Sequence, residues 1–431
     1  MQTRLNESIK NTPLGQQADA ILRSCVHCGF CNATCPTYQL LGDELDGPRG
    51  RIYLIKQMLE TDAASEKTQL HLDRCLTCRA CETTCPSGVE YGKLLDIGRA
   101  VIDNKVKRPF AERSLRRLLR LILPYPKRVR AALTMSPTLS WLLPKKLTAA
   151  IPSVQAVSAR NNAQNAHTSA QHSRQILLLE GCVQAATRPN INAAAITLFD
   201  QLDISLKSIS GSGCCGAVSH HLAAVEEGRD FMRRNIDAWW PTIENGAEAI
   251  ITTASACSLM VKDYGELLHD DPDYAEKAAK ISALCCDISE VLAAELLIET
   301  QKNKFSTIYI KDSKATRIAM HLPCTAQHGQ SLGKSIQSIL KSCGFKLTDV
   351  DDSHLCCGAA GTYTITQPVL SEQLHDNKLA ALTAESPDFI VTANIGCLLH
   401  MEKAAPVPII HWIELLAGNL MLTASTHKLH G

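Results

Sequence analysis

Eight of the nineteen cysteines in this 431-residue chain form two matching runs near the N-terminus. Each run fits the spacing C-x2-C-x2-C-x3-C-P at every position. Three thiolates two residues apart bind one iron–sulfur cubane, and the fourth, which precedes the proline, reaches the other cluster. The pattern therefore predicts two [4Fe–4S] clusters and one-electron chemistry. The first run is Cys25, Cys28, Cys31 and Cys35, and the second is Cys75, Cys78, Cys81 and Cys85.

The ligands of the two clusters are expected to cross over between the runs. Cys85 then completes the cluster of the first three cysteines of the first run, and Cys35 completes that of the second run. Structural zinc is the competing interpretation, because zinc sites also use C-x2-C pairs. Such sites take two pairs and require neither the third and fourth cysteines nor the proline, so the spacing favours iron–sulfur clusters.

The segment between the runs is expected to be helical. Ile52, Ile55, Met58 and Leu59 share one helical face within residues 50–60, and residues 66–73 also read as a helix. Residues 1–110 therefore resemble an all-helical ferredoxin-like domain, a type that docks on flavoproteins. Since the cysteines fill both sites, the nearby histidines and arginines are not expected to be ligands. Arg49 and Arg51 either face a cluster or partner or are solvated at a helix start, and His27 and His71 shape the surroundings.

A basic segment follows the ferredoxin-like domain. Twelve lysines or arginines and one acid, Glu112, lie between Lys105 and Lys146. Leu115, Leu118, Leu119 and Ile122 alternate with arginines, which predicts a basic amphipathic helix. Such a helix could lie on an anionic membrane surface, bind an acidic partner subunit, or pack with a solvated basic face. We assign residues 111–175 to this helical segment and a linker, of which residues 153–174 are rich in Ala, Ser, Asn and Gln.

The C-terminal part contains an internal repeat of about 120 residues. Cys182 and Cys214 are 32 positions apart, as are Cys324 and Cys356. Strand and helix patterns alternate in both copies, which predicts two α/β units with parallel sheets, over residues 176–300 and 301–431. The strands are expected to end at the cysteines, where such sheets bind ligands, and the glycine of each Cys-Cys-Gly motif would let the backbone turn tightly.

The repeat defines two further sets of four cysteines. They are either one or two more cluster or redox sites, or relics of an ancestral site that now pack as small apolar residues. Three other cysteines, Cys285, Cys286 and Cys343, occupy positions expected to fill strands and core. The two sets are Cys182, Cys214, Cys215 and Cys257, and Cys324, Cys356, Cys357 and Cys397.

Composition narrows the class of protein. A net charge of +1 and an aromatic content of 4% give no reason to expect a nucleic-acid partner. The polar N-terminus does not resemble a signal peptide, and no apolar run is long enough for a membrane span. We therefore expect a cytoplasmic protein in which the cysteines serve metal or redox chemistry, and no disulfide framework.

The tandem ferredoxin motifs and two Cys-Cys-Gly repeats together resemble the iron–sulfur subunits of membrane-associated flavin dehydrogenases. Relatives include the C subunit of anaerobic glycerol-3-phosphate dehydrogenase, lactate-utilisation proteins and the B subunit of heterodisulfide reductase. The sequence is most similar to the iron–sulfur subunits of bacterial glycolate oxidase (glycolate dehydrogenase). The segments that carry this resemblance are Ser24–Cys31, Pro36–Arg51, Asn235–Trp240 and Val391–Cys397.

The resemblance implies an electron-transfer subunit of a 2-hydroxy-acid dehydrogenase complex. A partner FAD-binding subunit would oxidise glycolate to glyoxylate, and this chain would pass the electrons toward a quinone or another membrane acceptor. It would then be peripheral on the cytoplasmic face of the inner membrane. The chain has no G-x-G-x-x-G motif, which agrees with substrate oxidation in a partner, and no residue of this chain is assigned a catalytic role.

The repeats depart from the wider family at one position. Heterodisulfide reductase-like repeats end in C-x2-C, whereas here Met260 and His400 replace the last cysteine. Five-cysteine clusters are therefore not expected, while four-cysteine cubanes, or His400 as an unusual ligand, remain open. The alternative functions are a subunit of a related lactate or glycerol-3-phosphate dehydrogenase, a disulfide or quinone reductase acting at the Cys-Cys-Gly sites, and a zinc-stabilised assembly protein.

Overall fold

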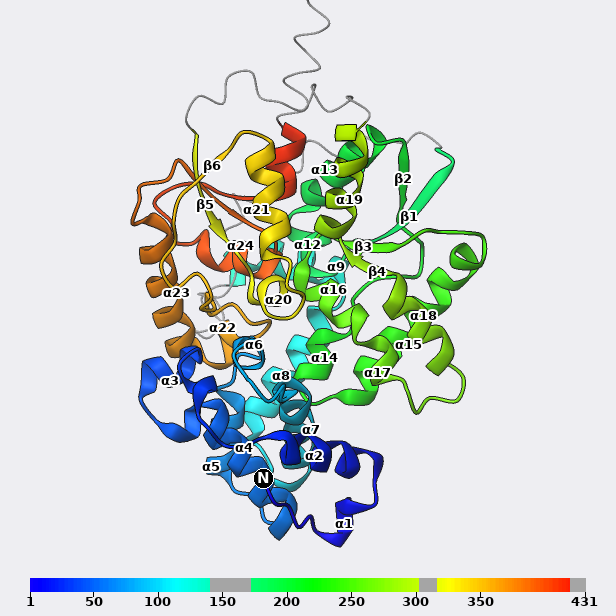
Figure 1. Cartoon of the computed structure of the whole chain (residues 1–431). Coiled ribbons are helices and arrows are strands. Elements are labelled where there is room, and N and C mark those ends of the chain that lie inside the picture. Colours follow the sequence, from blue (N-terminus) through cyan, green and yellow to red (C-terminus); the bar gives the residue numbers. More distant parts are fainter. Residues whose placement is uncertain (140–171, 302–315, 419–431) are drawn as a thin grey trace, which may run out of the picture.

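The computed structural model describes residues 1–139, 172–301 and 316–418, so most of the predicted linker over residues 153–174 lies outside the described residues. The N-terminal region is helical, and in Figure 1 its helices α1 to α7 lie in blue beneath the two α/β units. Its helices are α1 (Glu7–Lys10), α2 (Pro13–Ser24), α3 (Pro36–Leu41), α4 (Pro48–Thr61), α5 (Glu66–Asp73), α6 (Ala80–Thr83), α7 (Tyr91–Lys105), α8 (Phe110–Ile122) and α9 (Pro126–Leu139), with 3-10 turns η1 (Phe30–Asn32) and η2 (Glu44–Asp46).

The two helices predicted between the cysteine runs are present as α4 and α5. Pro48 starts α4, where a missing N–H costs nothing, and its four predicted apolar residues are all buried. Ser65 caps α5 by accepting a hydrogen bond from the Thr68 amide. Helix α7 packs closely on α4, because a Cβ at Gly98 would lie 2.8 Å from Ile55. These contacts fix the scaffold that carries both cysteine runs.

The first α/β unit contains a parallel four-stranded sheet in the order β2-β1-β3-β4. Helices on both faces cover it, as expected for parallel strands. Its elements are β1 (Arg174–Leu179), α12 (Val183–Thr187), α13 (Pro189–Asp200), β2 (Ile204–Lys207), α14 (Ala217–His221), α15 (Val225–Glu244), β3 (Ile250–Thr252), α16 (Ser255–Lys262), α17 (Tyr264–Leu267), α18 (Ala275–Leu284), β4 (Cys285–Asp287) and α19 (Ile288–Gln301).

The second unit repeats this topology as the parallel sheet β6-β5-β7-β8, so the predicted repeat of two parallel α/β units is confirmed. Its described elements are β5 (Arg317–His321), α20 (Cys324–Gln327), α21 (Gly333–Ser342), β6 (Lys346–Leu347), α22 (Tyr363–Thr366), α23 (Pro368–Thr383), β7 (Phe389–Thr392), α24 (Ile395–Met401) and β8 (Ile409–His411).

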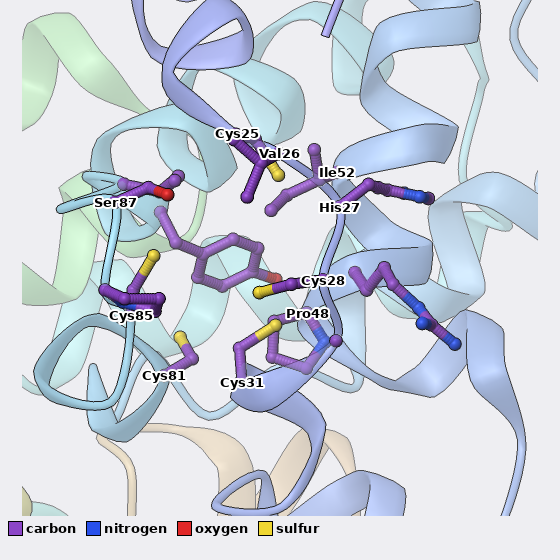
Figure 2. A pocket seen from close by; sticks show the side chains of 15 residues that line it. Cys25, Val26, His27, Cys28, Cys31, Pro48, Ile52, Cys81, Cys85 and Ser87 are labelled. Carbon is purple, nitrogen blue, oxygen red and sulfur yellow. The ribbon is translucent and has the colours of Figure 1, made fainter.

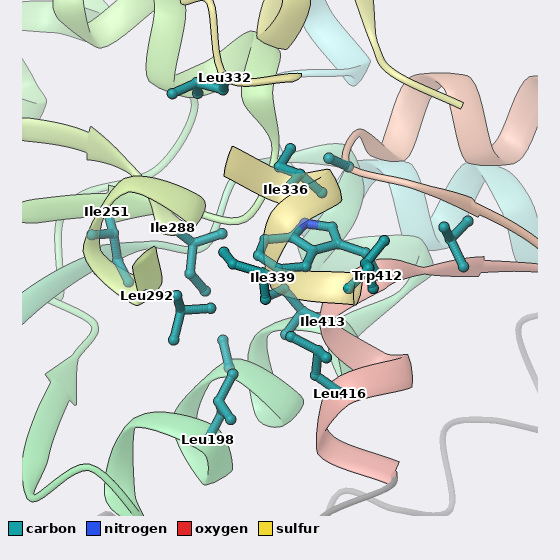
Figure 3. Close-up of a cluster of buried hydrophobic side chains, with 14 of the residues drawn as sticks. Leu198, Ile251, Ile288, Leu292, Leu332, Ile336, Ile339, Trp412, Ile413 and Leu416 are labelled. Carbon is teal, nitrogen blue, oxygen red and sulfur yellow. The ribbon is translucent and has the colours of Figure 1, made fainter. Parts of the chain in front are cut away.

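One hydrophobic core joins the two repeats (Figure 3). Leu198 and Ile251 of the first repeat and Ile336 and Trp412 of the second belong to the same buried group. The three cysteines expected to be filler are core residues: Cys285 and Cys286 lie in β4, and Cys343 follows α21. Because the core is shared, the repeats hold their cysteine sets in a fixed relation.

The strands are shorter than the sequence pattern suggests. Strand β2 ends at Lys207, well before Cys214, and β3 ends at Thr252. We expected Cys257 and Cys397 at strand ends, but they lie in the first turns of α16 and α24. The ladder stops where its neighbouring strands stop, and the helix that follows begins at once. Amides at a helix N-terminus favour thiolates, so this placement suits a metal-binding cysteine.

The basic segment forms α8 and α9. Leu119 of α8 is buried, whereas Leu118, predicted on the same face, is exposed. Arg116 pairs with Asp73 and Glu112, and Arg120 with Glu227. These ion pairs connect α8 to the ferredoxin-like region and to the first repeat. In the described ranges, none of the helices combines the length and apolar character that crossing a bilayer requires.

Candidate metal-cluster sites

The first N-terminal site, called the outer site below, comprises Cys25, Cys28, Cys31 and Cys85. These cysteines line a cavity of about 30 Å³, which Cys81 also touches. Figure 2 shows the cysteine side chains gathered around this space, which Tyr91 also lines. Cys28 is exposed, whereas Cys25 is buried. The site therefore lies close to the protein surface.

The second N-terminal site, the inner site, comprises Cys35, Cys75, Cys78 and Cys81. They line a cavity of about 20 Å³ together with Arg51 and Tyr91. Tyr91 and Cys81 line both cavities, so the two sites are neighbours. In each cavity, three cysteines of one run meet the last cysteine of the other run, which is the arrangement that a crossed ligand set requires.

The backbone repeats the same unusual conformation in both runs. His27 and Gly29 have positive φ, and so do their counterparts Thr77 and Arg79. The left-handed region is costly for side chains other than glycine, so its occurrence at matching positions marks loops shaped for a ligand. The Thr77 amide, for example, points to the Cys75 Sγ at 3.5 Å.

A buried polar network supports the inner site. Arg51 is fully buried, so the alternative of a solvated arginine at a helix start is wrong. It donates to the His71 carbonyl at 2.7 Å and to Thr37 Oγ1 at 3.1 Å. The carboxylate of Asp46 binds His71 Nδ1 at 2.9 Å and Arg74 at 2.7 Å. Arg49 remains partly exposed beside Glu44. Arg51 therefore places a positive charge beside the inner cysteines, and His71 acts as its support.

Burial and close packing raise the pKa values of several thiols, which indicates the kind of group that these cavities can bind. Burial, together with the negative charge of Cys25, raises the pKa of Cys31 to about 11, and burial holds the pKa of Cys78 and Cys81 well above the usual value. Without metal such thiols stay protonated at neutral pH, whereas bound metal ions deprotonate them. Four converging sulfurs and no competing carboxylate in the lining fit iron–sulfur clusters.

The structure also brings together the four cysteines of each repeat. In the first repeat each thiol lies beside the next in the order Cys182, Cys214, Cys215, Cys257. In the second repeat they follow the same order, Cys324, Cys356, Cys357, Cys397. A hydrogen bond to the next thiol and burial raise the pKa of Cys182 and Cys324 well above the usual value. Each set is thus a row of four neighbouring thiols.

The second-repeat cysteines lie against the inner site. Cys356 belongs to a small buried group with Leu76 and Tyr363, against which Cys78 and Cys324 pack. The Tyr363 hydroxyl donates to the Arg74 carbonyl at 2.9 Å and ties the two regions together. Of the first-repeat cysteines, Cys182 and Cys214 pack with Phe231 and Tyr125. Only the second set therefore adjoins the inner site among these contacts.

Sequence analysis missed one residue beside the second set. His321 lies with Cys357 and Cys397 in a group whose donor atoms are all within 4.8 Å of one another. His400, considered as a ligand, instead has its Nε2 3.3 Å from Ser371 Oγ. A comparison of the two repeats position by position would have found His321, because the equivalent residue is Leu179.

Comparison with known proteins agrees with this architecture. A model described as a 4Fe-4S dicluster domain matches residues 21–89, and one described as a cysteine-rich domain matches residues 176–262 and 318–402. The matched ranges contain all sixteen cysteines of the four sites. The N-terminal match covers the helical region, and the other two matches cover the α/β repeats.

Similar proteins extend over nearly the whole chain. The glycolate oxidase iron–sulfur subunit of Escherichia coli is 51% identical over 96% of this chain and 98% of its own length. A probable glycolate oxidase iron–sulfur subunit of Bacillus subtilis is 30% identical over 98% of both chains. Lactate utilization protein A of Bacillus licheniformis is 25% identical over 54% of this chain and 95% of its own length. The chain therefore belongs to the family of glycolate oxidase iron–sulfur subunits.

Proposed function

We propose that this chain is an electron-transfer subunit with two [4Fe–4S] clusters, one held by the outer-site and one by the inner-site cysteines. The observation that carries the proposal is the pair of adjacent cavities, each lined by three cysteines of one run and the last of the other. When bound, such clusters supply one-electron transfer. The thiolates hold them, and Arg51 balances negative charge at the inner site.

The outer site is the proposed entry point for electrons. Its surface carries the exposed apolar side chains of Val26 and Phe30 beside exposed Cys28. Exposed apolar residues next to a redox site suit contact with a partner. We propose that this partner is an FAD-binding subunit that oxidises glycolate to glyoxylate; the names of the relatives support glycolate as the substrate.

The second-repeat cysteines are the proposed exit, because they adjoin the inner site. We propose that they hold a further redox centre and that a quinone or another membrane acceptor receives the electrons. Helix α8 would bring the protein to the cytoplasmic face of the inner membrane, since Phe110, Leu118 and Leu121 are exposed among its arginines.

Iron analysis of anaerobically purified protein tests the two-cluster proposal. Two cubanes require about eight iron atoms per chain, with an EPR signal from reduced, interacting clusters. Cys85→Ala and Cys35→Ala should each remove the signal of the cluster completed by that cysteine. Fewer than about eight irons with intact cysteines, or zinc in place of iron, would contradict the proposal.

Co-purification and activity assays test the partner and the substrate. The native complex should contain a flavin-binding subunit and oxidise glycolate faster than lactate or glycerol 3-phosphate. Preference for lactate or glycerol 3-phosphate would instead favour the related dehydrogenases. Sedimentation with vesicles of anionic phospholipid tests the membrane contact: Leu118→Gln with Leu121→Gln should lower binding, and equal binding would remove α8 from the proposed membrane surface.

A further inference from the structure

A third cavity lies where the N-terminal region meets both repeats. Its volume is about 190 Å³, far larger than the cavities of about 30 and 20 Å³ at the outer and inner sites. Leu76 lines it from the N-terminal region, Val218 from the first repeat and Thr366 from the second. We call it the junction cavity. It is large enough to receive a small molecule beside the cysteines.

Cysteines of two proposed redox centres form part of its lining. Cys75 belongs to the inner site, and Cys356 and Cys397 belong to the second repeat. Apolar side chains such as Leu222 and Leu259 line much of the remainder. Largely apolar pockets with a few placed polar groups are typical small-molecule sites. This lining suits a planar, apolar molecule that accepts electrons.

A carboxylate and two imidazoles, from different regions of the chain, meet at this cavity. Asp96 of α7 and His221 of α14 both line it, and His221 Nδ1 lies 3.5 Å from Asp96 Oδ1. His220 Nε2 lies 3.4 Å from the other oxygen, Oδ2. Burial opposes ionisation of Asp96, but the two imidazoles outweigh it and hold its pKa well below the usual range. The His221 side chain is 39% exposed, so it can exchange protons with solvent.

The other charged groups of the lining already have partners. Arg79 binds Asp263 at 2.8 Å, and Arg116 approaches Asp73 at 3.3 Å. Arg99 donates to the carbonyl oxygens of Leu72 and Cys75. Asp96 and His221, by contrast, contact each other only loosely, because the 3.5 Å between Asp96 Oδ1 and His221 Nδ1 is long for a hydrogen bond. His221, held by the carboxylate of Asp96, is therefore the group best placed to give a proton to a molecule in the cavity.

Helix α8 connects the cavity to the proposed membrane-facing surface. Its Arg116 lines the cavity, while Phe110, Leu118 and Leu121 are exposed on the same helix. A molecule that partitions into lipid would be held close to this cavity if α8 lies on a membrane surface. This placement favours a lipid-soluble acceptor over a water-soluble disulfide.

We propose that the junction cavity binds a quinone headgroup and is the place where this chain reduces it, with His221 as proton donor, reprotonated from solvent, and Asp96 as the residue that orients it. This inference rests on the proposed electron-transfer function. The quinone takes up two electrons, which originate from the reduced flavin of the partner subunit, and two protons that arrive through His221. Both carbonyl oxygens become hydroxyl groups, and no other bond breaks.

The test compares two acceptors in the purified complex with glycolate as donor. Ferricyanide reports electron entry alone, and decylubiquinone reports the proposed site. Val218→Trp and Thr366→Trp each fill the cavity from a different side and should lower the decylubiquinone rate at least 10-fold, with the ferricyanide rate and iron content retained. Val369→Trp, at an exposed position on α23, is the matched control and should change neither rate. Two variants are used so that, if one of them misfolds, the other still tests the cavity.

Binding is measured separately from activity. An azidoquinone should label peptides that contain residues 217–222 or 359–366, and Val218→Trp should abolish this labelling. His221→Gln should lower the decylubiquinone rate and move its pH optimum toward acid, where solvent can supply the proton, while labelling persists. His172→Gln is the control, because His172 pairs with Asp200 away from the cavity.

Some results would overturn the inference. Decylubiquinone rates equal to wild type in both tryptophan variants, or labelling confined to a partner subunit, would exclude the junction cavity. An unchanged rate and pH profile in His221→Gln would exclude its role as proton donor. These failures differ from failure of the proposed function, which would appear in the wild type as a complex that reduces neither acceptor.

Discussion

The two repeats place four cysteines on the same scaffold but surround them with different side chains. Three residues before the first cysteine stands Leu179 in one repeat and His321 in the other, and three residues after the last cysteine stand Met260 and His400. All four are buried. The backbone is matched, because Gly216 and Gly358 both have positive φ and face equivalent helices, α15 and α23.

The contacts of the cysteines differ in the same sense. In the first repeat, Asn235 and Tyr264 donate to the carbonyl oxygens of Cys214 and Cys215, both at 2.9 Å. In the second repeat, buried Lys378 donates to the Asp352 carbonyl. His375 packs edge-on against His400, with 4.8 Å between the ring centroids. Neutral, satisfied surroundings are typical of a structural site, and buried ionisable groups are typical of a functional one.

This difference indicates a division of labour between the repeats. Cysteines of the second set adjoin the inner site and line the junction cavity, whereas Cys182 and Cys214 of the first set pack with Phe231 and Tyr125. Duplication of a fold preserves the strand order and the turns, since these depend on backbone and core. The environment of each site then depends on a few side chains and on which neighbour packs against it.

Removal of one cysteine from each set should give the largest difference in activity between the two repeats. Cys356→Ala should lower electron transfer to quinone by more than about 100-fold, because even residues behind a metal ligand contribute 10–100-fold. Cys214→Ala, in the set away from the inner site, should lower the rate of electron transfer to quinone by less than about 10-fold on the same scale. Steady-state rates with glycolate measure both. Equal losses would show that the repeats share one electron path.

Alanine at the two glycines tests whether the scaffold is equivalent. A Cβ at Gly358 would lie 2.6 Å from the Ser371 carbonyl oxygen, and one at Gly216 would lie 2.8 Å from that of Gly228. Both positions also have positive φ, so each substitution should lower the free energy of unfolding by about 1–3 kcal/mol. Denaturant titration measures the change. A cost in only one repeat would contradict the equivalence of the two backbones.

Acid should destabilise the second repeat through His411. Burial lowers the pKa of His411 to about 4, whereas an unfolded histidine titrates near 6.5. Between these values the unfolded chain binds more protons, so stability present above about pH 6.5 falls by about 1.4 kcal/mol per pH unit toward pH 4. Denaturation at several pH values should show a smaller slope for His411→Gln. An identical slope would assign the acid sensitivity to other groups.

The smallest expected effect is on the reduction potential of the second-repeat centre. Burial lowers the pKa of Lys378, and nearby thiolates oppose this by favouring its charged form. Lys378→Met removes a positive charge and should lower the potential by on the order of 50 mV. Redox titration followed by EPR measures it. Asn235→Met, at the equivalent position of the first repeat, removes no charge and provides the matched comparison.

Local patterns in the sequence predicted much of the architecture. Helices α4 and α5 and the apolar face of α4 follow from residue spacing, because helical periodicity is a local property. The equal spacing of Cys182–Cys214 and Cys324–Cys356 predicted two matching units, and the strand orders agree. Strand ends were less predictable, since a strand stops where its neighbours stop. Cys257 and Cys397 consequently lie on helices.

The sequence by itself determined the cysteine chemistry, the repeat and the family, because spacing and residue type carry that information directly. Only the tertiary structure decided which cysteine sites lie next to one another and which side chains surround them. It buried Arg51 beside the inner cysteines, brought Cys78 against Cys356, and joined Asp96 to His221 across more than a hundred residues of chain. The reason is physical: such contacts depend on how separate cores pack against one another, and no local pattern encodes that packing.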